Sequence, residues 1–383
     1  MHERLFTAGF VLLTAADLGY FTATGVAVYA LPLYVTGPLG GDEAAAGLAF
    51  GAFAVSALVL RPFAGVLTDR LGRRPLLVGG ALLCAVGMAL TALADSTAVV
   101  VALRLLLGVA EAAFFVAGFA ALADLAAPTR LGEALSYNSL GLYLGLAFGP
   151  PLGEVLVERG GFTWAWLAAA GLSVVAAVLA ASIGETRGPR EPAPVRLVHR
   201  PAIAPSIGFC TSLAAIGGFL TFAALHARDV GLANTSLPLF VYGIVVVVSR
   251  IAFARVPDRL PSLPLAAGAL ASIASGLVLA AAWTTPLGLI AGTVLLALGV
   301  TFSTPAFFSA VFATALPRER GAAAGTASAF LDLGLGGGPI LLGLVARSAG
   351  IPWALAGAGL IALAGCAWTV TLVRAAGRGA AAP

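Results

Sequence analysis

The sequence contains no lysine: all 21 of its basic residues are arginines. This absence excludes a P-loop ATPase, whose phosphate-binding loop needs a Gly-Lys-Ser/Thr run, and any enzyme that forms a Schiff base on lysine. Charged residues make up only 10% of the chain, against about 25% in ordinary soluble domains, whereas hydrophobic residues make up 60%. A soluble core has no room for so much apolar surface, and disordered chains have the opposite composition. The composition therefore predicts an integral membrane protein.

Cysteine and histidine are also scarce, with three residues of each. Cys84, Cys210 and Cys366 lie far apart, each in an apolar run, and are predicted to be small buried hydrophobic residues without disulfides. The histidines do not have the spacing of metal ligands, and no His/Asp or Cys/His pair lies at a predicted membrane interface. We therefore expect no metal, no cofactor and no enzymatic activity. The net charge of +4 is explained by membrane topology rather than by nucleic acid.

Twelve stretches are long and apolar enough to cross the hydrocarbon core as helices, which needs about 20 residues each. The first stretch is too long for the apolar region of a secretory signal, contains Asp17 and is followed by eleven others. The predicted spans are 5–31, 44–67, 75–94, 98–122, 133–157, 162–183, 203–225, 234–256, 262–282, 286–311, 321–345 and 351–373.

Arginine placement predicts the orientation of these spans. With the N-terminus inside the cell, 15 arginines lie in cytoplasmic segments and 3 in external loops, which leaves Arg61, Arg104 and Arg250 within spans. Because basic residues concentrate in cytoplasmic loops, both termini are predicted to be cytoplasmic. The chain is expected in the inner (plasma) membrane as a multi-pass protein.

The longest connection, 185–202, is rich in proline and arginine and predicts a cytoplasmic linker. It separates two halves, 1–184 and 203–376, and a tail at 377–383 is expected to be disordered. The halves are related by a constant offset: LRPFAGVLTDRL at 60–71 aligns without gaps on SRIAFARVPDRL at 249–260, and the same shift matches Gly149-Pro150 to Gly338-Pro339. The sequence therefore predicts an all-α membrane protein of 12 transmembrane helices, in two six-helix halves related by a parallel pseudo-two-fold repeat.

Between the second and third predicted spans, residues 65–74 read GVLTDRLGRR. This segment resembles the signature loop of the major facilitator superfamily, G-x-L-x-D-R-x-G-R-R, at every defining position. A glycine permits the tight turn and the charges stay hydrated at the cytoplasmic interface. The residues that match are Gly65, Leu67, Asp69, Arg70, Gly72, Arg73 and Arg74.

The resemblance implies a twelve-helix transporter, similar to the bacterial drug and sugar efflux permeases of that superfamily. It also implies that the loop is a cytoplasmic latch, which holds the halves together in the outward-facing state and releases them in the inward-facing state. A topology signal alone is the alternative. The second copy keeps Asp258 and Arg259 but lacks the glycine and the double arginine, which predicts a weaker latch there.

The fourth predicted span resembles another motif of the superfamily, an arginine followed four residues later by glycine, here Arg104 and Gly108. Glu111 lies seven residues after Arg104 and so shares its helix face, about 10 Å away along the axis. A structural ion-pair network is the alternative to a functional role for this pair.

GLAFGPPLG at 145–153 resembles the core of the superfamily's antiporter motif, G-x-x-x-G-P-x-x-G-G. It departs from that motif where Glu154 replaces the last glycine and where Ser136 replaces an earlier one. Since glycines on one stripe let helices approach closely, packing is the alternative explanation. The predicted packing residues are Gly145, Gly149, Pro150 and Gly153, with Gly334, Gly338 and Pro339 in the second half.

Three acidic residues, Asp17, Glu111 and Asp332, lie at mid-membrane positions of predicted spans. A charge at mid-membrane is costly, so such residues usually face a cavity and carry function. Burial disfavours the ionised form of a carboxyl group, as a proton-coupling site requires. We predict Asp17 first and Glu111 second as proton carriers, whereas helix packing explains Asp332 equally well. Arg61 and Arg250 are predicted to act in gating or structural pairing.

The resemblance implies that the first, fourth, seventh and tenth spans line a central cavity. The substrate-cavity candidates are Tyr20, Phe21, Phe114, Phe115, Phe307 and Thr301, for which helix packing is again the alternative. A cavity of this character suits a lipophilic or moderately polar molecule better than a polyanion.

The predicted function is secondary active transport by alternating access, as proton-coupled efflux of a small amphiphilic compound. A sugar or metabolite symporter or uniporter, and a non-transporting membrane scaffold or sensor, are the alternatives. The expected partners are the substrate, protons and the lipid bilayer, without nucleic acid, and the functional unit is expected to be a monomer.

Overall fold

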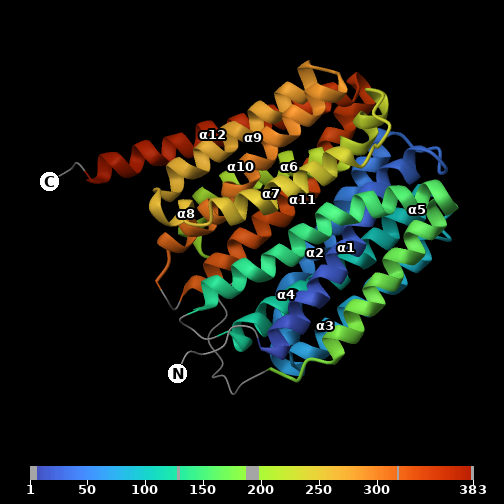
Figure 1. The fold of residues 1–383 in the computed structure, drawn as a ribbon. Coiled ribbons are helices and arrows are strands. Elements are labelled where there is room, and N and C mark those ends of the chain that lie inside the picture. Colours follow the sequence, from blue (N-terminus) through green and yellow to red (C-terminus); the bar gives the residue numbers. More distant parts are fainter. Residues whose placement is uncertain (1–6, 127–129, 187–197, 317–318, 381–383) are drawn as a thin grey trace. The chain divides into compact units, whose positions relative to one another are not determined.

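The computed structural model describes residues 7–126, 130–186, 198–316 and 319–380, without the side chains of 131–133, 135, 136, 258 and 377–380. The regular elements of these residues are all helical, as predicted (Figure 1). They are α1 (Ala8–Thr36), α2 (Glu43–Leu71), α3 (Arg73–Thr91), α4 (Thr97–Leu125), α5 (Leu131–Ala181), η2 (Arg200–Ala202), α6 (Ile203–Asp229), α7 (Leu237–Ala252), α8 (Val256–Arg259), α9 (Ser262–Ala282), α10 (Pro286–Ala313), α11 (Arg320–Ala349) and α12 (Ile351–Ala380).

In the described part of the chain, ten helices are long and apolar enough to cross a membrane. The prediction of twelve spans differs from this count at two helices. α5 has 51 residues and includes both predicted spans 133–157 and 162–183, and α7 has only 16 residues. Twelve crossings therefore remain a prediction.

The length of α5 is explained by a bend at Gly161. A straight helix of 51 residues would be about 76 Å long, more than twice the thickness of a hydrocarbon core. Gly161 has φ 73° and ψ −179°, a non-helical conformation that glycine adopts without a steric penalty. Figure 1 shows α5 as two arms that meet at a bend.

The chain forms two compact units. Unit 1 comprises Met1–Gly40 and Ala52–Ala193, and unit 2 comprises Gly41–Gly51 and Pro194–Pro383. The main difference from the predicted halves is that 41–51, at the start of α2, groups with unit 2. α12 continues to Ala380 and so extends into the segment 377–383 that was expected to be a disordered tail.

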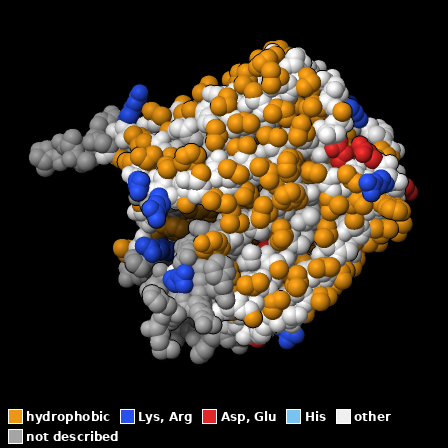
Figure 2. Space-filling view, in the orientation of Figure 1, with side chains coloured by type: hydrophobic (Ala, Val, Ile, Leu, Met, Phe, Trp, Pro, Cys, Tyr) orange, Lys and Arg blue, Asp and Glu red, His pale blue; other side chains and the backbone are white. Residues whose placement is uncertain are grey.

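Hydrophobic side chains are spread across the face seen in Figure 2, with few charged groups among them. On α11 and α12, Leu341, Trp353 and Leu360 are each more than 60% exposed, at 62%, 66% and 63%. An apolar surface of this extent marks a membrane or partner interface, and here it accompanies helices of membrane-spanning length.

Candidate functional site

Unit 1 contains a group of polar side chains buried among four helices, which we call the buried polar cluster. Three of its members are charged residue types with almost no exposure: Asp17 is 5% exposed, and Arg104 and Glu111 are 6% exposed each. The cluster consists of Asp17 and Tyr20 on α1, Cys84 on α3, Arg104 and Glu111 on α4, and Asn138 on α5.

Asp17 is held by a neutral amide from α5. The Nδ2 group of Asn138 donates a hydrogen bond of 2.6 Å to Oδ2 of Asp17. The hydroxyl of Thr14, one turn earlier on α1, donates to Oδ1 of Asn138 at 3.2 Å and fixes the orientation of that amide. On the α4 side, a Cβ added to Gly118 would lie 3.9 Å from Oδ1 of Asp17, so the carboxyl group faces the backbone of α4.

Glu111 lies between a hydroxyl group and a guanidinium group. The Tyr20 side chain is in hydrogen-bonding contact with both Glu111 and Cys84. The guanidinium of Arg104 interacts electrostatically with Glu111, and its Cζ atom lies 4.8 Å from the ring centroid of Phe53. Arg104 therefore has an acidic group and an aromatic face as neighbours, both of which stabilise its charge.

The charges of this cluster do not cancel when both acids are ionised. Asp17 and Glu111 are close enough to interact electrostatically, and Arg104 supplies one positive charge. Counted over these three side chains, two carboxylates and one guanidinium sum to one negative charge, and charge in a buried site is expensive. Binding of a single proton would balance these three charges, so proton exchange is one chemistry that such a group of residues allows.

The other predicted charges lie elsewhere. Asp332 is 2% exposed on α11 and belongs to unit 2, as does Arg250 at the end of α7. Arg61 on α2 places its Cζ atom 4.8 Å from the ring centroid of Phe115 on α4, in a cation–π contact. Their predicted roles in coupling and gating stay predictions.

Most of the predicted cavity aromatics are packed inside their own units, and Phe115 is half-buried. Tyr20 and Phe114 stack with ring centroids 4.1 Å apart and are each 1% exposed, and Phe21 is 8% exposed. In unit 2, Phe307 is fully buried, and the hydroxyl of Thr301 donates to a backbone carbonyl of its own helix. Their role as cavity lining also stays a prediction.

Sequence analysis missed two contributors to the cluster. Asn138 is a single amide in an apolar span, and a lone neutral amide gives no signal as distinctive as that of a charged residue. Cys84 was predicted to be a small buried hydrophobic residue; it is buried and free, but its thiol also accepts a hydrogen bond from the Ser173 hydroxyl at 3.4 Å.

A second site surrounds Arg73 in the signature loop, which is only 1% exposed. Its Nε atom donates to Oδ2 of Asp124, at the end of α4, over 3.0 Å. Its Nη1 atom donates to Oδ1 of Asp69 and to the backbone carbonyl of Thr68, both at 3.0 Å. All of these partners belong to unit 1, so these contacts fasten α2, α3 and α4 together within one unit.

The beginning of α3 is capped by an acidic residue from beyond α5. Glu185 accepts hydrogen bonds from the backbone N–H groups of Arg73 at 2.9 Å and Arg74 at 3.2 Å. A carboxylate at a helix N-terminus satisfies free N–H groups and complements the helix dipole. Gly72, which precedes the helix, has φ 107°, so the predicted tight turn does need glycine.

These contacts describe the signature loop inside unit 1. Asp69 forms an ion pair with Arg73, and its side chain is 70% exposed. Its predicted role as a latch between the two halves stays a prediction. Sequence analysis did not single out Asp124 or Glu185. In the second copy, the side chain of Asp258 lies outside the described part of the chain, and Arg259 is exposed at the end of α8.

Comparison with known proteins agrees with this architecture. A family model described as Major Facilitator Superfamily matches residues 13–315. The chain belongs to this superfamily. It is therefore a multi-pass membrane transporter, as the signature loop predicted.

Members of the superfamily match along nearly the whole chain. An uncharacterized MFS-type transporter of Salmonella typhimurium is 29% identical over 383 residues, which cover 95% of this chain and 96% of that protein. The uncharacterized MFS-type transporter YhhS of Escherichia coli is 28% identical over 357 residues, which cover 90% of this chain and 87% of that protein.

Solved structures of the superfamily share the fold. A bacterial homologue of the human lysosomal transporter Spinster, in an inward-facing and occupied conformation, has a TM-score of 0.76 and 15% identity, over 95% of this chain and 96% of that one. The nucleoside transporter NupG has a TM-score of 0.74 and 15% identity, over 96% of this chain and 98% of that one.

Proposed function

We propose that this transporter exports a small amphiphilic compound across the bacterial inner membrane in exchange for protons. Both termini would lie in the cytoplasm. Twelve crossings would result if each of the two arms of α5 crosses the membrane once and the short α7 also crosses it. The observation that carries the proposal is the buried polar cluster, in which two acids and one arginine are buried on helices of membrane-spanning length.

The charge balance of the cluster supports one proton-binding step. Alternating access exposes a site first to one side of the membrane and then to the other. A proton taken up on one side neutralises the cluster, and its release on the other side restores the negative charge. We assign Asp17 as the carrier, because Arg104 lies near Glu111 and gives that acid a positively charged partner, whereas Asp17 is hydrogen-bonded to the neutral amide of Asn138.

The substrate class is proposed from the residues available for contact. The superfamily fold serves transporters of different compounds, so the fold does not specify a substrate. The predicted lining residues are chiefly aromatic, with hydroxyl groups beside them and without a cluster of basic residues. Such a lining binds an apolar body with one or two polar groups better than it binds a phosphate ester.

The test is proton movement driven by a compound gradient in liposomes that contain the purified protein and a pH-sensitive dye. When a transported compound is added outside, an antiporter moves protons out as the compound enters, and the lumen becomes more alkaline. A symporter makes the lumen more acidic, and a uniporter leaves the pH unchanged; either result would reject the proposal. Liposomes without protein provide the baseline for each compound in the panel.

A further inference from the structure

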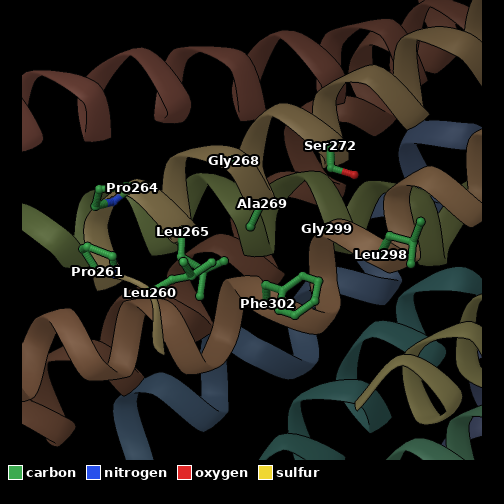
Figure 3. Close-up of a pocket in the computed structure, with 10 residues that line it drawn as sticks. All are labelled: Leu260, Pro261, Pro264, Leu265, Gly268, Ala269, Ser272, Leu298, Gly299 and Phe302. Atoms are coloured by element: carbon green, nitrogen blue, oxygen red, sulfur yellow. The ribbon is translucent and has the colours of Figure 1, made fainter. Parts of the chain in front are cut away.

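An apolar groove lies between α9 and α10 in unit 2 (Figure 3). Its volume is about 400 Å³, and its lining includes Leu260, Pro264, Leu265, Leu298 and Phe302. The residues at its rim, among them Leu260 and Pro264, are exposed, whereas Ala269 and Gly299 at its floor are buried. The groove is therefore open on one side.

The side chains that line the groove are poorly suited to bind a polar ligand. Its hydroxyl group, on Ser272, already donates a hydrogen bond of 2.7 Å to the backbone carbonyl of Leu295. From Pro264 to Ser272 the lining of α9 extends for about 12 Å along the helix axis. An elongated apolar group fits such a site.

Two exposed arginines, Arg255 and Arg259, precede the residues that line one end of this groove. The short helix α8 (Val256–Arg259) leads directly into Leu260, the first lining residue, and both Arg255 and Arg259 are exposed. Asp258 lies between them in sequence, so this segment carries one net positive charge. Figure 2 shows basic side chains gathered at the end of the molecule where Figure 1 places α8.

We propose that the groove binds an anionic phospholipid, with one acyl chain between α9 and α10 and its phosphate held by Arg255 and Arg259. Guanidinium groups bind phosphate oxygens through charge-assisted hydrogen bonds, which favours an anionic lipid over a neutral one. On the orientation that the arginines predict, this end of α9 lies at the cytoplasmic leaflet, whose surface carries anionic lipids. The site is separate from the buried polar cluster, which belongs to unit 1.

Gly268 lies on the groove lining and has room for an added side chain to begin there. A Cβ added there would meet no other atom within 4 Å. Gly268→Leu should therefore occupy the space of the acyl chain. Gly171→Leu is the matched control, because Gly171 also lies within a long apolar helix, α5, and has equally open space around it.

The headgroup contact is tested separately. The double variant Arg255→Gln/Arg259→Gln removes the two arginines at the groove. Its control is Arg159→Gln/Arg228→Gln, which removes two exposed arginines elsewhere and changes the net charge equally. These four are surface substitutions, so the test does not depend on whether a filled groove is tolerated.

The measurement is native mass spectrometry of detergent-purified protein with phosphatidylglycerol or phosphatidylcholine at equal concentrations. The wild type and both controls should retain phosphatidylglycerol roughly fivefold to thirtyfold better, as one or two arginine contacts of about 1 kcal/mol each would give. The variant at Arg255 and Arg259 should retain both lipids equally, and Gly268→Leu should lose most of the retention of both.

Three results would overturn the proposal. Equal retention of the two lipids by the wild type would show that the arginines do not select a headgroup. Undiminished retention of phosphatidylglycerol by Gly268→Leu would place the lipid elsewhere. A dimer that Gly268→Leu dissociates would identify a second copy of this chain as the occupant.

Discussion

Gly149 on α5 and Gly25 on α1 approach so closely that a Cβ on Gly149 would meet the Cα and carbonyl carbon of Gly25. In unit 2, a Cβ on Gly338 of α11 would meet the backbone of Ala214 on α6. The repeat offset that aligns the two copies of the loop also aligns Gly149 with Gly338 and Gly25 with Ala214. The offset therefore relates one contacting pair of residues to the other. The glycine-rich helix α5 packs on α1 in unit 1 in the same way that α11 packs on α6 in unit 2.

Gly338→Ala should lower the thermal stability of the protein, whereas Gly337→Ala should not. The added methyl group at Gly338 meets backbone, which cannot move aside, and overpacking of this kind costs about 1–3 kcal/mol. At Gly337 the same atom meets nothing within 4 Å, and alanine is a better helix former by about 1 kcal/mol. The measurement is size-exclusion chromatography of each purified variant after heating, which gives the temperature at which the monodisperse peak falls to half its height. Equal losses at both positions would contradict the close-packing explanation.

The fold could largely be predicted from the sequence because its signals are strong and local. Runs of apolar residues specify helices, and the constant offset between the two copies of the loop specifies the repeat. The break predicted between the fifth and sixth spans falls at residues 158–161, which read ERGG, and the chain does bend there, at Gly161. The sequence does not show that this bend takes a single residue, so that the two predicted spans form one continuous element, α5.

A cysteine at position 159 should react from outside the cell, because the bend at Gly161 is predicted to lie at the external surface. In a background without the three native cysteines, Arg159→Cys should be labelled by a membrane-impermeant maleimide in intact cells. Ser182→Cys, at the C-terminal end of α5, and Arg74→Cys, in the signature loop, should be labelled only after permeabilisation. All three positions are exposed, so access alone does not distinguish them. Labelling of position 182 without labelling of position 159 would mean that α5 crosses the membrane once.

Asp124→Asn should destabilise the protein more than Asp69→Asn does. The side chain of Asp124 is only 12% exposed and accepts a hydrogen bond from the buried Arg73, whereas that of Asp69 is 70% exposed. Loss of the buried charged partner should cost about 1–3 kcal/mol, and loss of the exposed one no more than about 1 kcal/mol. Urea-dependent loss of function in proteoliposomes and thermal unfolding in detergent both measure this order. If Asp69→Asn is the more destabilising of the two, Arg73 depends chiefly on the signature loop itself.

The candidate site could be predicted only in part. Asp17, Glu111 and Arg104 stand out in the sequence because charged residues are rare within apolar spans. Their neighbours Asn138 and Cys84 do not stand out, since one amide or thiol in a helix has no distinctive spacing. Which helices face one another is decided by tertiary packing, and only the structure brings α1, α3, α4 and α5 together around these acids.

Asp17→Asn should abolish accumulation driven by a pH gradient while substrate binding and downhill exchange continue. The substitution preserves the size of the side chain and an oxygen that can accept the hydrogen bond from Asn138, but it removes the group that exchanges a proton. Accumulation should then fall to the level set by the compound's own gradient. Glu111→Gln should impair both accumulation and downhill exchange, because Glu111 also positions Arg104 and Tyr20.

The control for this assignment is Asp332→Asn, which removes an equally buried acid in unit 2. It distinguishes the loss of a coupling site from the general effect of removing a buried carboxyl group. The comparison needs one transported compound, proteoliposomes with a fixed pH gradient, and a separate binding measurement for each variant. If Asp17→Asn accumulates the compound as well as the wild type while Asp332→Asn does not, the proton is carried in unit 2, and the Asp17–Asn138 pair serves only to pack α1 against α5.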